Sequence, residues 1–245
     1  MTSIIITMAG LGTRFQREGY KKPKYEILAK GKTLFRWSLI SLKKFLNDEN
    51  EIIFITLKSN NSRSFIESQM IHFKKIKWKI VELNSVTKGQ AETVMYCEKF
   101  LNPLNPILIY NIDTYVNPDY INPSDYNFKS WIPYFKTNKQ NFSFIKINKE
   151  GKVINVKEKE KISNMASVGL YGFESFKSFK LIYSEFYSKE DNKERYIAPL
   201  YNVLIAMGKQ IGISSIPESE VNILGTPEEL KEFLKNEAQY FLECL

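Results

Sequence analysis

The sequence predicts an α/β protein built around a mostly parallel, doubly wound sheet. Short apolar runs rich in β-branched residues, the pattern of buried parallel strands, recur along the first half of the chain. Segments with apolar residues at helical spacing lie between these runs. Because strands that alternate with helices favour right-handed crossovers, the runs are expected to form one parallel sheet.

Each expected element of the first half follows from this pattern. Apolar and β-branched runs predict strands at 4–7, 51–57, 78–83 and 106–115. A short extended piece is expected at 25–28. Thr33 is a suitable N-cap for a helix whose apolar residues run from 34 to 46, and 62–73 is also expected to be helical. A further helix opens within 87–94 and is expected to run to about residue 100.

The second half is more irregular. A long loop rich in Pro, Asn, Asp and Tyr is expected at 117–139, with one strand-like piece at 131–135. The alternating run 142–147, the turn 149–152 and the run 153–159 predict a β-hairpin. Strands are expected at 166–173 and 211–216, and helices at 176–187 and from about 201 to 208. Thr226 and Pro227 open the last helix as N-cap and first residue.

Composition bounds the class of protein. At 245 residues the chain is long enough for one large domain, and 43% hydrophobic with 25% charged residues is ordinary for a soluble protein. The net charge of +8 raises the question of nucleic acid, but the lysines are scattered and form no long basic run, so no nucleic-acid partner is expected. A positive field favours the approach of phosphorylated substrates.

The counts of cysteine and histidine, and the absence of a long apolar run, limit the cellular compartment and the kinds of site that are expected. Two cysteines, Cys97 and Cys244, make no disulfide framework, which fits a reducing cytoplasm. We expect neither a signal peptide nor a membrane span, because the N-terminus leads straight into a strand and no apolar run approaches about 18 residues. The single histidine, His72, excludes a histidine-based triad or metal site.

The turn after the first strand has the chemistry of a phosphate site. Gly10 and Gly12 let the backbone bend sharply, and the exposed amide N–H groups of such a turn form an anion-binding nest. Arg14 and Lys24 add a bidentate fork and a point charge. The turn is not a P-loop, since no Gly-Lys-Ser/Thr follows, and it lacks the third glycine of a dinucleotide fingerprint.

Two further segments add polar groups. Gly89 and the small and polar residues after it stand at a helix N-terminus, which can receive anions or hydrogen-bond a base. Asp113 lies near the carboxyl end of the fourth expected strand, and ligands of open parallel sheets bind beyond the carboxyl ends of the strands. An Asp placed there can hold Mg²⁺ together with phosphate oxygens.

These motifs together resemble the signature of nucleotidyltransferases that make NDP-sugars and CDP-alcohols. In that family a strand leads to Ala-Gly-x-Gly-Thr-Arg and then to Pro-Lys. Every position is filled here, by Ala9, Gly10, Gly12, Thr13, Arg14, Pro23 and Lys24. The string Gly225-Thr-Pro-Glu-Glu-Leu230 is a further match, and the resemblance covers nearly the whole chain with its motifs in the expected order.

The resemblance implies a Rossmann-like, GT-A-type nucleotidyltransferase fold with a small β-hairpin acceptor subregion. It implies a single domain over 1–245, with a nucleotide-binding half at 1–116 and an acceptor-binding half at 117–245 that carries the hairpin and the C-terminal helix. The partners would be an NTP and a phosphorylated small-molecule acceptor, with Mg²⁺ as cofactor. Oligomeric state is left open, with a homodimer among the options.

Residue roles follow from the same resemblance. Arg14 and Lys24 would be catalytic, and Asp113 would bind the metal. Glu158 and Lys159 at the hairpin end, with Glu194 and Tyr196, are acceptor-site candidates. The candidates for nucleotide contact are Met8, Ala9, Gly10, Leu11, Gly12, Thr13, Lys88, Gly89, Gln90, Thr93 and Asn111.

The implied reaction is attack by an acceptor phosphate on the α-phosphorus of the NTP, with release of pyrophosphate. It needs no protein nucleophile, so catalysis would come from alignment and charge neutralisation. The family's sugar nucleotidyltransferases usually carry a second metal-binding Asp two residues before the glycine of the last motif. Ile223 stands there, so the second carboxylate comes from elsewhere, with Glu158 as one option, or the substrates themselves bridge the metal.

The substrates are expected from a weaker resemblance. The variants Lys22-Pro-Lys-Tyr-Glu26 and Asn111-Ile-Asp-Thr-Tyr115 resemble small cytidylyltransferases of capsule and surface-polysaccharide decoration, which use CTP and activate phosphocholine or phosphoglutamine. A hexose-1-phosphate nucleotidyltransferase is the competing enzyme. Two hypotheses assign the protein to a different functional class, a GT-A glycosyltransferase or an inactive nucleotide-binding homologue. The glycosyltransferase is disfavoured because the usual Asp-x-Asp pair is missing at 111–113.

Overall fold

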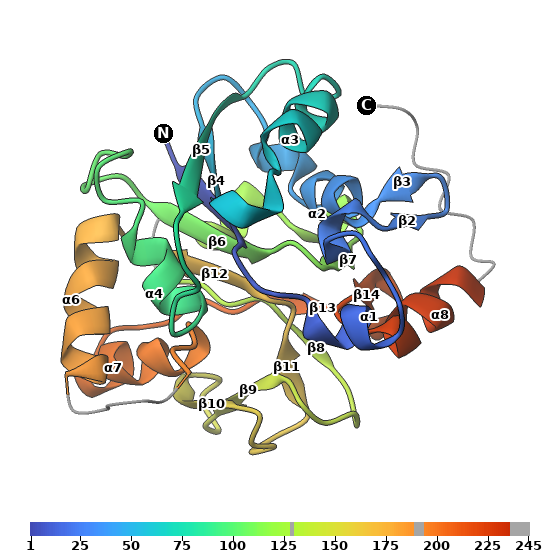
Figure 1. The fold of residues 1–245 in the computed structure, drawn as a ribbon. Coiled ribbons are helices and arrows are strands. Elements are labelled where there is room, and N and C mark those ends of the chain that lie inside the picture. The colour runs from blue at the N-terminus through green and yellow to red at the C-terminus, as the bar shows by residue number, and fades with distance from the viewer. Residues whose placement is uncertain (128–129, 189–193, 236–245) are drawn as a thin grey trace.

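The computed structural model describes residues 1–127, 130–188 and 194–235. A five-stranded sheet in the order β12-β6-β1-β4-β5 runs through the centre of the molecule (Figure 1). β1 pairs in parallel with β4 and β6, and β4 pairs in parallel with β5, whereas β12 is antiparallel to β6. The mostly parallel sheet is thus confirmed. Its strands are β1 (Ser3–Met8), β4 (Glu51–Leu57), β5 (Lys77–Leu83), β6 (Ile107–Asn111) and β12 (Leu170–Phe173).

Helices cover both faces of this sheet. Side chains of a strand alternate between faces, so Ile4 and Ile6 of β1 enter one apolar cluster and Ile5 enters another. The Ile4 and Ile6 cluster includes residues of α2 (Leu34–Ser41) and α3 (Arg63–Met70). The other cluster includes residues of three helices, which gather on one side of the molecule (Figure 1): α4 (Gln90–Met95), α6 (Phe176–Tyr187) and α7 (Tyr201–Ala206).

A second five-stranded sheet, in the order β10-β9-β11-β8-β13, lies below the central sheet in Figure 1. The expected hairpin is confirmed, because β9 and β10 pair in antiparallel fashion. The strands are β8 (Tyr134–Lys136), β9 (Ser143–Ile147), β10 (Val153–Glu158), β11 (Met165–Ser167) and β13 (Ser215–Ile216).

The remaining strands form two separate pairs. β2 (Leu28–Ala29) pairs with β3 (Lys32–Thr33), and β7 (Thr114–Val116) pairs with β14 (Val221–Ile223). The remaining α-helices are α1 (Thr13–Arg17), α5 (Pro123–Tyr126) and α8 (Pro227–Lys235). Single 3-10 turns occur at Lys24–Glu26, Lys43–Phe45, Lys58–Asn60, Pro118–Tyr120, Ala198–Leu200 and Glu218–Glu220.

Two expected strands are each divided in the structure. The run 106–115 forms β6 and β7, with a turn at Ile112 and Asp113, because β7 leaves the central sheet to pair with β14. The run 166–173 forms β11 and β12 in different sheets, and Gly169 between them has a positive φ of 77°. The apolar pattern predicted the extended backbone but not the point at which each strand changes partner.

Other expected boundaries also need correction. The helix expected to reach about residue 100 ends at Met95, and the helix expected at 34–46 ends at Ser41 with a 3-10 turn beyond it. Residues 24–26 form a 3-10 turn rather than an extended piece. Strands begin only at Tyr134 and Ser215 within the runs 131–135 and 211–216. The Thr33 cap is confirmed, since its hydroxyl accepts the Arg36 N–H at 3.2 Å, and Cys244 lies outside the described residues.

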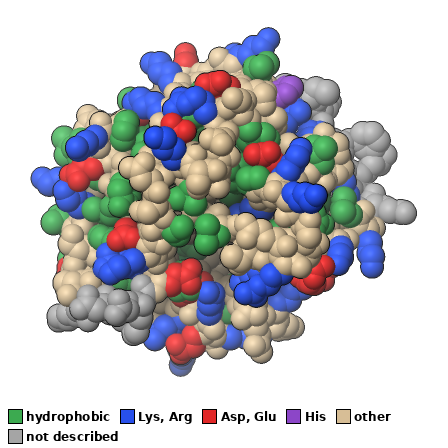
Figure 2. Space-filling model, in the orientation of Figure 1, with side chains coloured by type: hydrophobic (Ala, Val, Ile, Leu, Met, Phe, Trp, Pro, Cys, Tyr) green, Lys and Arg blue, Asp and Glu red, His purple; other side chains and the backbone are tan. Residues whose placement is uncertain are grey.

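The surface carries no single block of positive charge on the face in Figure 2. Lys and Arg side chains are interspersed there with Asp, Glu and uncharged groups. Within the described ranges, no helix has both the length and the apolar character needed to cross a membrane.

Candidate active site

Two adjoining cavities lie beyond the carboxyl ends of the central parallel strands. The first has a volume of about 510 Å³ and is bordered by the glycine turn and the 86–90 segment. The second, of about 320 Å³, is bordered by the hairpin, the β11–β12 connection and the start of the last helix. Their linings share Gln90, Asn111, Asp113 and Glu194. The cavities therefore meet along one polar edge.

The glycine turn forms one wall of the first cavity. β1 ends at Met8, and the chain passes through Gly10 and then Gly12, which has a φ of 64° before α1 begins. A Cβ on Gly12 would lie 3.9 Å from Cβ of Lys24, so Lys24 is packed against the turn. Its position comes from the 3-10 turn that follows Pro23. Backbone N–H groups and a lysine thus border the same space, as an anion site requires.

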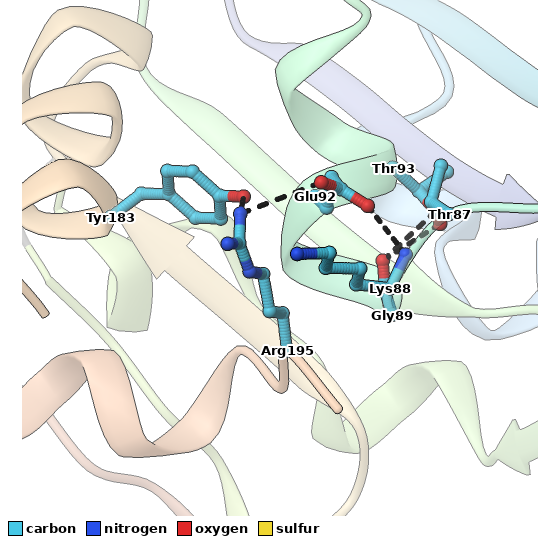
Figure 3. Close-up of polar contacts among 7 residues, drawn as sticks. All are labelled: Thr87, Lys88, Gly89, Glu92, Thr93, Tyr183 and Arg195. Atoms are coloured by element: carbon cyan, nitrogen blue, oxygen red, sulfur yellow. Dashed lines mark hydrogen bonds and ion pairs between the residues drawn. The ribbon is translucent and has the colours of Figure 1, made fainter. Parts of the chain in front are cut away.

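The loop before α4 forms the opposite wall and is internally braced (Figure 3). The Thr87 and Thr93 hydroxyls lie 2.6 Å apart, and both donate to the Gly89 carbonyl, at 3.1 and 3.0 Å. The Glu92 carboxylate accepts the Lys88 backbone N–H. Because these side chains hydrogen-bond to groups of the same loop, they fix the loop's shape. The Lys88 side chain takes no part in these bonds and is exposed.

Gln90 and Asn111 form a hydrogen-bonded pair on the edge between the cavities. Gln90 Nε2 donates to Asn111 Oδ1 at 2.8 Å and to Thr7 Oγ1 at 3.1 Å. The Asn111 N–H donates to the Gly169 carbonyl at 3.1 Å. A Cβ on Gly169 would overlap the Asn111 side chain, so this close packing needs glycine.

Asp113 lies in the turn between β6 and β7 and lines both cavities. Lys24 Nζ lies 2.5 Å from Asp113 Oδ2, and both side chains are largely shielded, with 24% and 17% of their surface exposed. A Cβ on Gly225 would lie 3.0 Å from Asp113 Oδ2 and 3.5 Å from Glu229 Oε2. The missing side chain at Gly225 therefore brings two carboxylates close to one point.

Glu229 belongs to the first turn of α8. Its N–H donates to Thr226 Oγ1 at 3.2 Å, the geometry of a capping box. Its Oε2 atom is buried and has no hydrogen-bond partner among the described residues. Burial raises the pKa of this carboxyl and the nearby Asp113 charge adds to the rise, against the lowering effect of hydrogen bonds from Thr226 and Gly225. The Glu229 carboxylate therefore lies beside Asp113 with one oxygen available to bind a cation or a hydrogen-bond donor.

The second cavity contains another half-buried acid, Glu158, at the end of β10. Its carboxylate accepts the Ser143 hydroxyl, which also lies 3.2 Å from the Tyr171 hydroxyl. Burial raises the pKa of Glu158, against the lowering effects of the Ser143 hydrogen bond and of Lys159. Hydroxyl groups and a carboxylate therefore line the floor of this cavity.

Lys159, Glu194 and Tyr196 form a cluster at its rim. Lys159 Nζ donates to the Tyr196 hydroxyl at 2.5 Å and lies 4.7 Å from the ring centroid. The Tyr196 hydroxyl donates to Glu194, whose carboxylate is 3.6 Å from Lys159 Nζ. Hydrogen bonding to Tyr196 raises the pKa of Lys159, so the ammonium is retained at neutral pH.

The structure gathers almost all of the candidate residues around these cavities. Arg14 lines the second cavity and not the first, so it lies on the acceptor side of the position expected for it. Lys159 contacts the rim residues without lining either cavity. Glu158 and Tyr196 line the second cavity, and Glu194 lines both. The residues lining the first are Met8, Ala9, Gly10, Leu11, Gly12, Thr13, Lys24, Lys88, Gly89, Gln90, Thr93, Asn111 and Asp113.

Sequence reasoning missed two residues with evident roles in the site's architecture. In the sequence, Glu229 is only one position of the string Gly225–Leu230, with no role in the site assigned to it. The Thr-x-x-Glu spacing marks a capping box, but only the fold brings it to Asp113. Arg195 lies between two acceptor candidates and contacts the 87–93 loop, a link between distant segments that its local sequence does not indicate.

The fold is that of a Rossmann-like nucleotidyltransferase, with a parallel-rich sheet and cavities at the carboxyl ends of its strands. A nucleoside-diphosphate-sugar pyrophosphorylase from Vibrio cholerae RC9 is 32% identical in sequence, with a TM-score of 0.86 and with 94% of this chain and 99% of that chain aligned. Because this similarity spans both chains, the protein belongs to the nucleotidyltransferase superfamily.

Two more distant structures share the fold. A Bacillus anthracis protein assigned as a glucose-1-phosphate thymidylyltransferase has a TM-score of 0.75 at 19% identity, with 96% of this chain and 94% of that chain aligned. The inositol-1-phosphate CTP transferase of T. maritima has a TM-score of 0.73 at 15% identity, with 97% of each chain aligned. No protein-family model and no curated protein sequence matches the chain.

Proposed function

We propose that this protein transfers a nucleoside monophosphate from an NTP to a phosphorylated small molecule and releases pyrophosphate. The observation that carries the proposal is the pair of cavities that meet at Asp113. The first, bordered by backbone N–H groups and Lys24, takes the NTP. The second, lined by hydroxyls and carboxylates, takes the acceptor. An acceptor phosphate oxygen would then approach the α-phosphorus at their common edge.

The chain's own residues act by alignment and charge neutralisation. The amides of 9–13 hold the triphosphate, and Lys24 neutralises charge that builds up at the α-phosphate. Arg14, on the acceptor side, orients the attacking phosphate. Gln90 and Asn111 hydrogen-bond the nucleoside and hold it against the 87–93 loop. The pyrophosphate leaves with the electron pair of the broken P–O bond, so no residue needs to act as nucleophile.

The residues beside Gly225 fit a divalent cation such as Mg²⁺. Asp113 Oδ2 and the buried, unpartnered Glu229 Oε2 converge on the space that a Gly225 side chain would fill. Hard oxygen ligands of this kind suit Mg²⁺, which is usually held by one or two carboxylates together with substrate phosphates. The bound cation would supply charge neutralisation at the phosphates. The described residues contain no cluster of three or more His, Cys, Asp or Glu side chains suited to a metal.

CTP is the proposed donor, and a phosphocholine- or phosphoglutamine-like molecule of surface-polysaccharide modification is the proposed acceptor. The variant motifs at 22–26 and 111–115 support this choice. So does the charge of the second cavity, whose lining has four acids, Asp113, Glu158, Glu194 and Glu229, against one cation, Arg14. Such a cavity suits an acceptor with an ammonium group in addition to its phosphate.

An NDP-sugar product is the second candidate. The Vibrio cholerae relative is described as a nucleoside-diphosphate-sugar pyrophosphorylase. The Ser143 and Tyr171 hydroxyls, beside the Glu158 carboxylate, also suit the hydroxyl groups of a hexose 1-phosphate. The two candidates differ in the charge of the acceptor, which makes them separable by assay.

A substrate matrix tests both. Purified protein with Mg²⁺ is incubated with each NTP and with phosphocholine, phosphoglutamine and hexose 1-phosphates, and pyrophosphate release is measured. Activity with CTP and either phosphocholine or phosphoglutamine is expected, whereas activity confined to hexose 1-phosphates would establish the second candidate. No pyrophosphate release in any combination, together with unchanged NTP binding in Asp113→Ala, would overturn the enzyme proposal.

The cation site has its own readout. Mn²⁺ binding followed by electron paramagnetic resonance, in the presence of CTP, should weaken in Glu229→Gln and in Asp113→Asn. Glu228→Gln, one residue away in the same helix turn and exposed, is the matched control. Equal Mn²⁺ affinity in all the variants would contradict the assignment of these carboxylates.

A further inference from the structure

The side chain of Arg195 joins two helices, α4 and α6 (Figure 3). Its Nη1 donates to the Tyr183 hydroxyl of α6 and lies 3.4 Å from Glu92 Oε1 of α4. The guanidinium also lies over the rings of Tyr183 and Tyr187, with centroid distances of 5.5 and 5.4 Å. Only 16% of the side-chain surface is exposed. The guanidinium is therefore held within the fold, too shielded for a surface charge that contacts substrate from solution.

The backbone of Arg195 is bonded to the same loop. Its N–H donates to the Lys88 carbonyl at 2.9 Å, and its carbonyl accepts the Ala91 N–H at 2.9 Å. The contact is so close that a Cβ on Gly89 would lie 2.6 Å from both the N and the O of Arg195. Backbone and side chain together attach this residue to both ends of the loop's turn.

The residues on either side of Arg195 border the second cavity, and Glu194 lines the first as well. Glu194 and Tyr196 line the second cavity, and their carboxylate and hydroxyl hold Lys159. A displacement of the 87–91 backbone therefore moves the residues that border the acceptor. Glu92 completes the connection, because its two carboxylate oxygens bond to the Lys88 N–H and to Arg195.

We propose that Arg195 is a positioning residue that couples the nucleotide loop at 87–91 to the acceptor segment at 194–198. The inference rests on the proposed function and adds to it that filling the first cavity orders the second. Arginine suits this position because its planar fork reaches a hydroxyl and a carboxylate at once while stacking on aromatic rings. Coupling of this kind is reciprocal, so an acceptor would equally tighten NTP binding.

Hydrogen–deuterium exchange of the full chain tests the coupling without a known acceptor. In the wild type, CTP with Mg²⁺ should slow amide exchange at 9–13, at 87–91 and, through Arg195, at 195–198. A slowing of about fivefold or more at 195–198 is expected, the low end of couplings between sites. Arg195→Met should keep the slowing at 9–13 and reduce it at 195–198, where only the two backbone hydrogen bonds to the loop remain. Arg195→Lys, which retains the charge without the fork, should recover it in part.

Two further variants separate coupling from stability. Tyr183→Phe removes one hydroxyl partner but keeps the ring, so it should weaken the response at 195–198 even if Arg195→Met folds poorly. Arg63→Met, which breaks the 2.8 Å pair with Glu82 on the surface, should leave every response unchanged. An unaltered response at 195–198 in both Arg195→Met and Tyr183→Phe, or none in the wild type, would overturn the inference. If no NTP slows exchange at 9–13, the proposed function fails and takes this inference with it.

Discussion

Asp113 lies where both cavities meet, so its charge is the first target for mutation. Asp113→Asn keeps the size of the side chain but removes the charge that pairs with Lys24 at 2.5 Å. We expect kcat/KM for pyrophosphate release to fall by about 100-fold or more, the usual cost of losing one electrostatic group in a site. Asp119→Asn is the control, since that side chain is 82% exposed and pairs only loosely with Lys44, at 3.8 Å. Equal losses in the two variants would contradict a role for Asp113.

Glu158 provides a prediction on pH. Its pKa is raised in the folded protein because burial disfavours the carboxylate. The folded state therefore binds more protons than the unfolded state, and this carboxyl's contribution to stability falls as pH rises from the unfolded pKa through the folded one. Glu158→Gln removes that loss. The variant should gain stability relative to wild type as pH rises above 4.5, the ordinary pKa of the group, measured by urea unfolding, whereas a difference that shrinks with pH would contradict the prediction.

Individual site residues can be predicted from the sequence where a short motif fixes their relative positions. The residues 9–13 and Lys24 border one cavity because a strand, a glycine turn and a following turn place them locally. Glu229 and Arg195 could not be predicted in the same way. Each acts through a contact with a segment over 100 residues away, and a side chain missing at Gly225 or Gly89 makes the approach feasible.

The loop before α4 is the element whose shape the site most depends on. Gly89 has a φ of 150°, and a Cβ there would lie 2.6 Å from the backbone of Arg195. Gly89→Ala should destabilise the protein by about 2 kcal/mol, within the range for strained or overpacked backbone sites. Calorimetric melting should show a decrease of several degrees.

Gly10→Ala is the matched control for that change. A Cβ at Gly10 would meet no atom within 4 Å, so its melting temperature should stay near that of the wild type. Equal melting temperatures in Gly89→Ala and wild type would show that the two segments can separate at no cost. That result would also weaken the coupling assigned to Arg195.

Element boundaries show what local pattern leaves out. The runs 106–115 and 166–173 each continue with strand-forming residues on both sides of Asp113 and Gly169, so the local pattern does not mark these two residues as the points where the chain changes sheets. The position of each break is set by strand pairing, because β7 pairs with β14, and β11 pairs with β8 and β9. These breaks place Asp113 and Asn111 on the edge between the cavities, so the least predictable backbone positions are also the ones that build the site.

The two halves of the molecule share one sheet and its core. β12, from the second half, completes the central sheet by pairing with β6, from Leu170 opposite Tyr110 to Phe173 opposite Ile107. The Tyr126 hydroxyl, with its single hydrogen, lies within hydrogen-bond distance of two carbonyls, that of Ile107 at 2.9 Å and that of Phe173 at 2.6 Å. Buried hydrogen bonds of this kind are costly to leave unmade. We therefore propose one folding unit, although each half supplies a different cavity wall.

This proposal predicts how the whole chain unfolds. Because removal of residues 117–245 would expose the β6 edge and one apolar face of the sheet, a fragment of residues 1–116 should lack cooperative structure. The full chain should unfold in one transition, with coincident urea curves from tryptophan fluorescence and far-ultraviolet circular dichroism. Trp37 and Trp78 report on the first half and Trp131 on the second, so a Trp131→Phe variant and a Trp37→Phe/Trp78→Phe double variant separate the two signals. Midpoints that differ between these variants' fluorescence and circular dichroism curves, or a folded 1–116 fragment, would show two units instead of one.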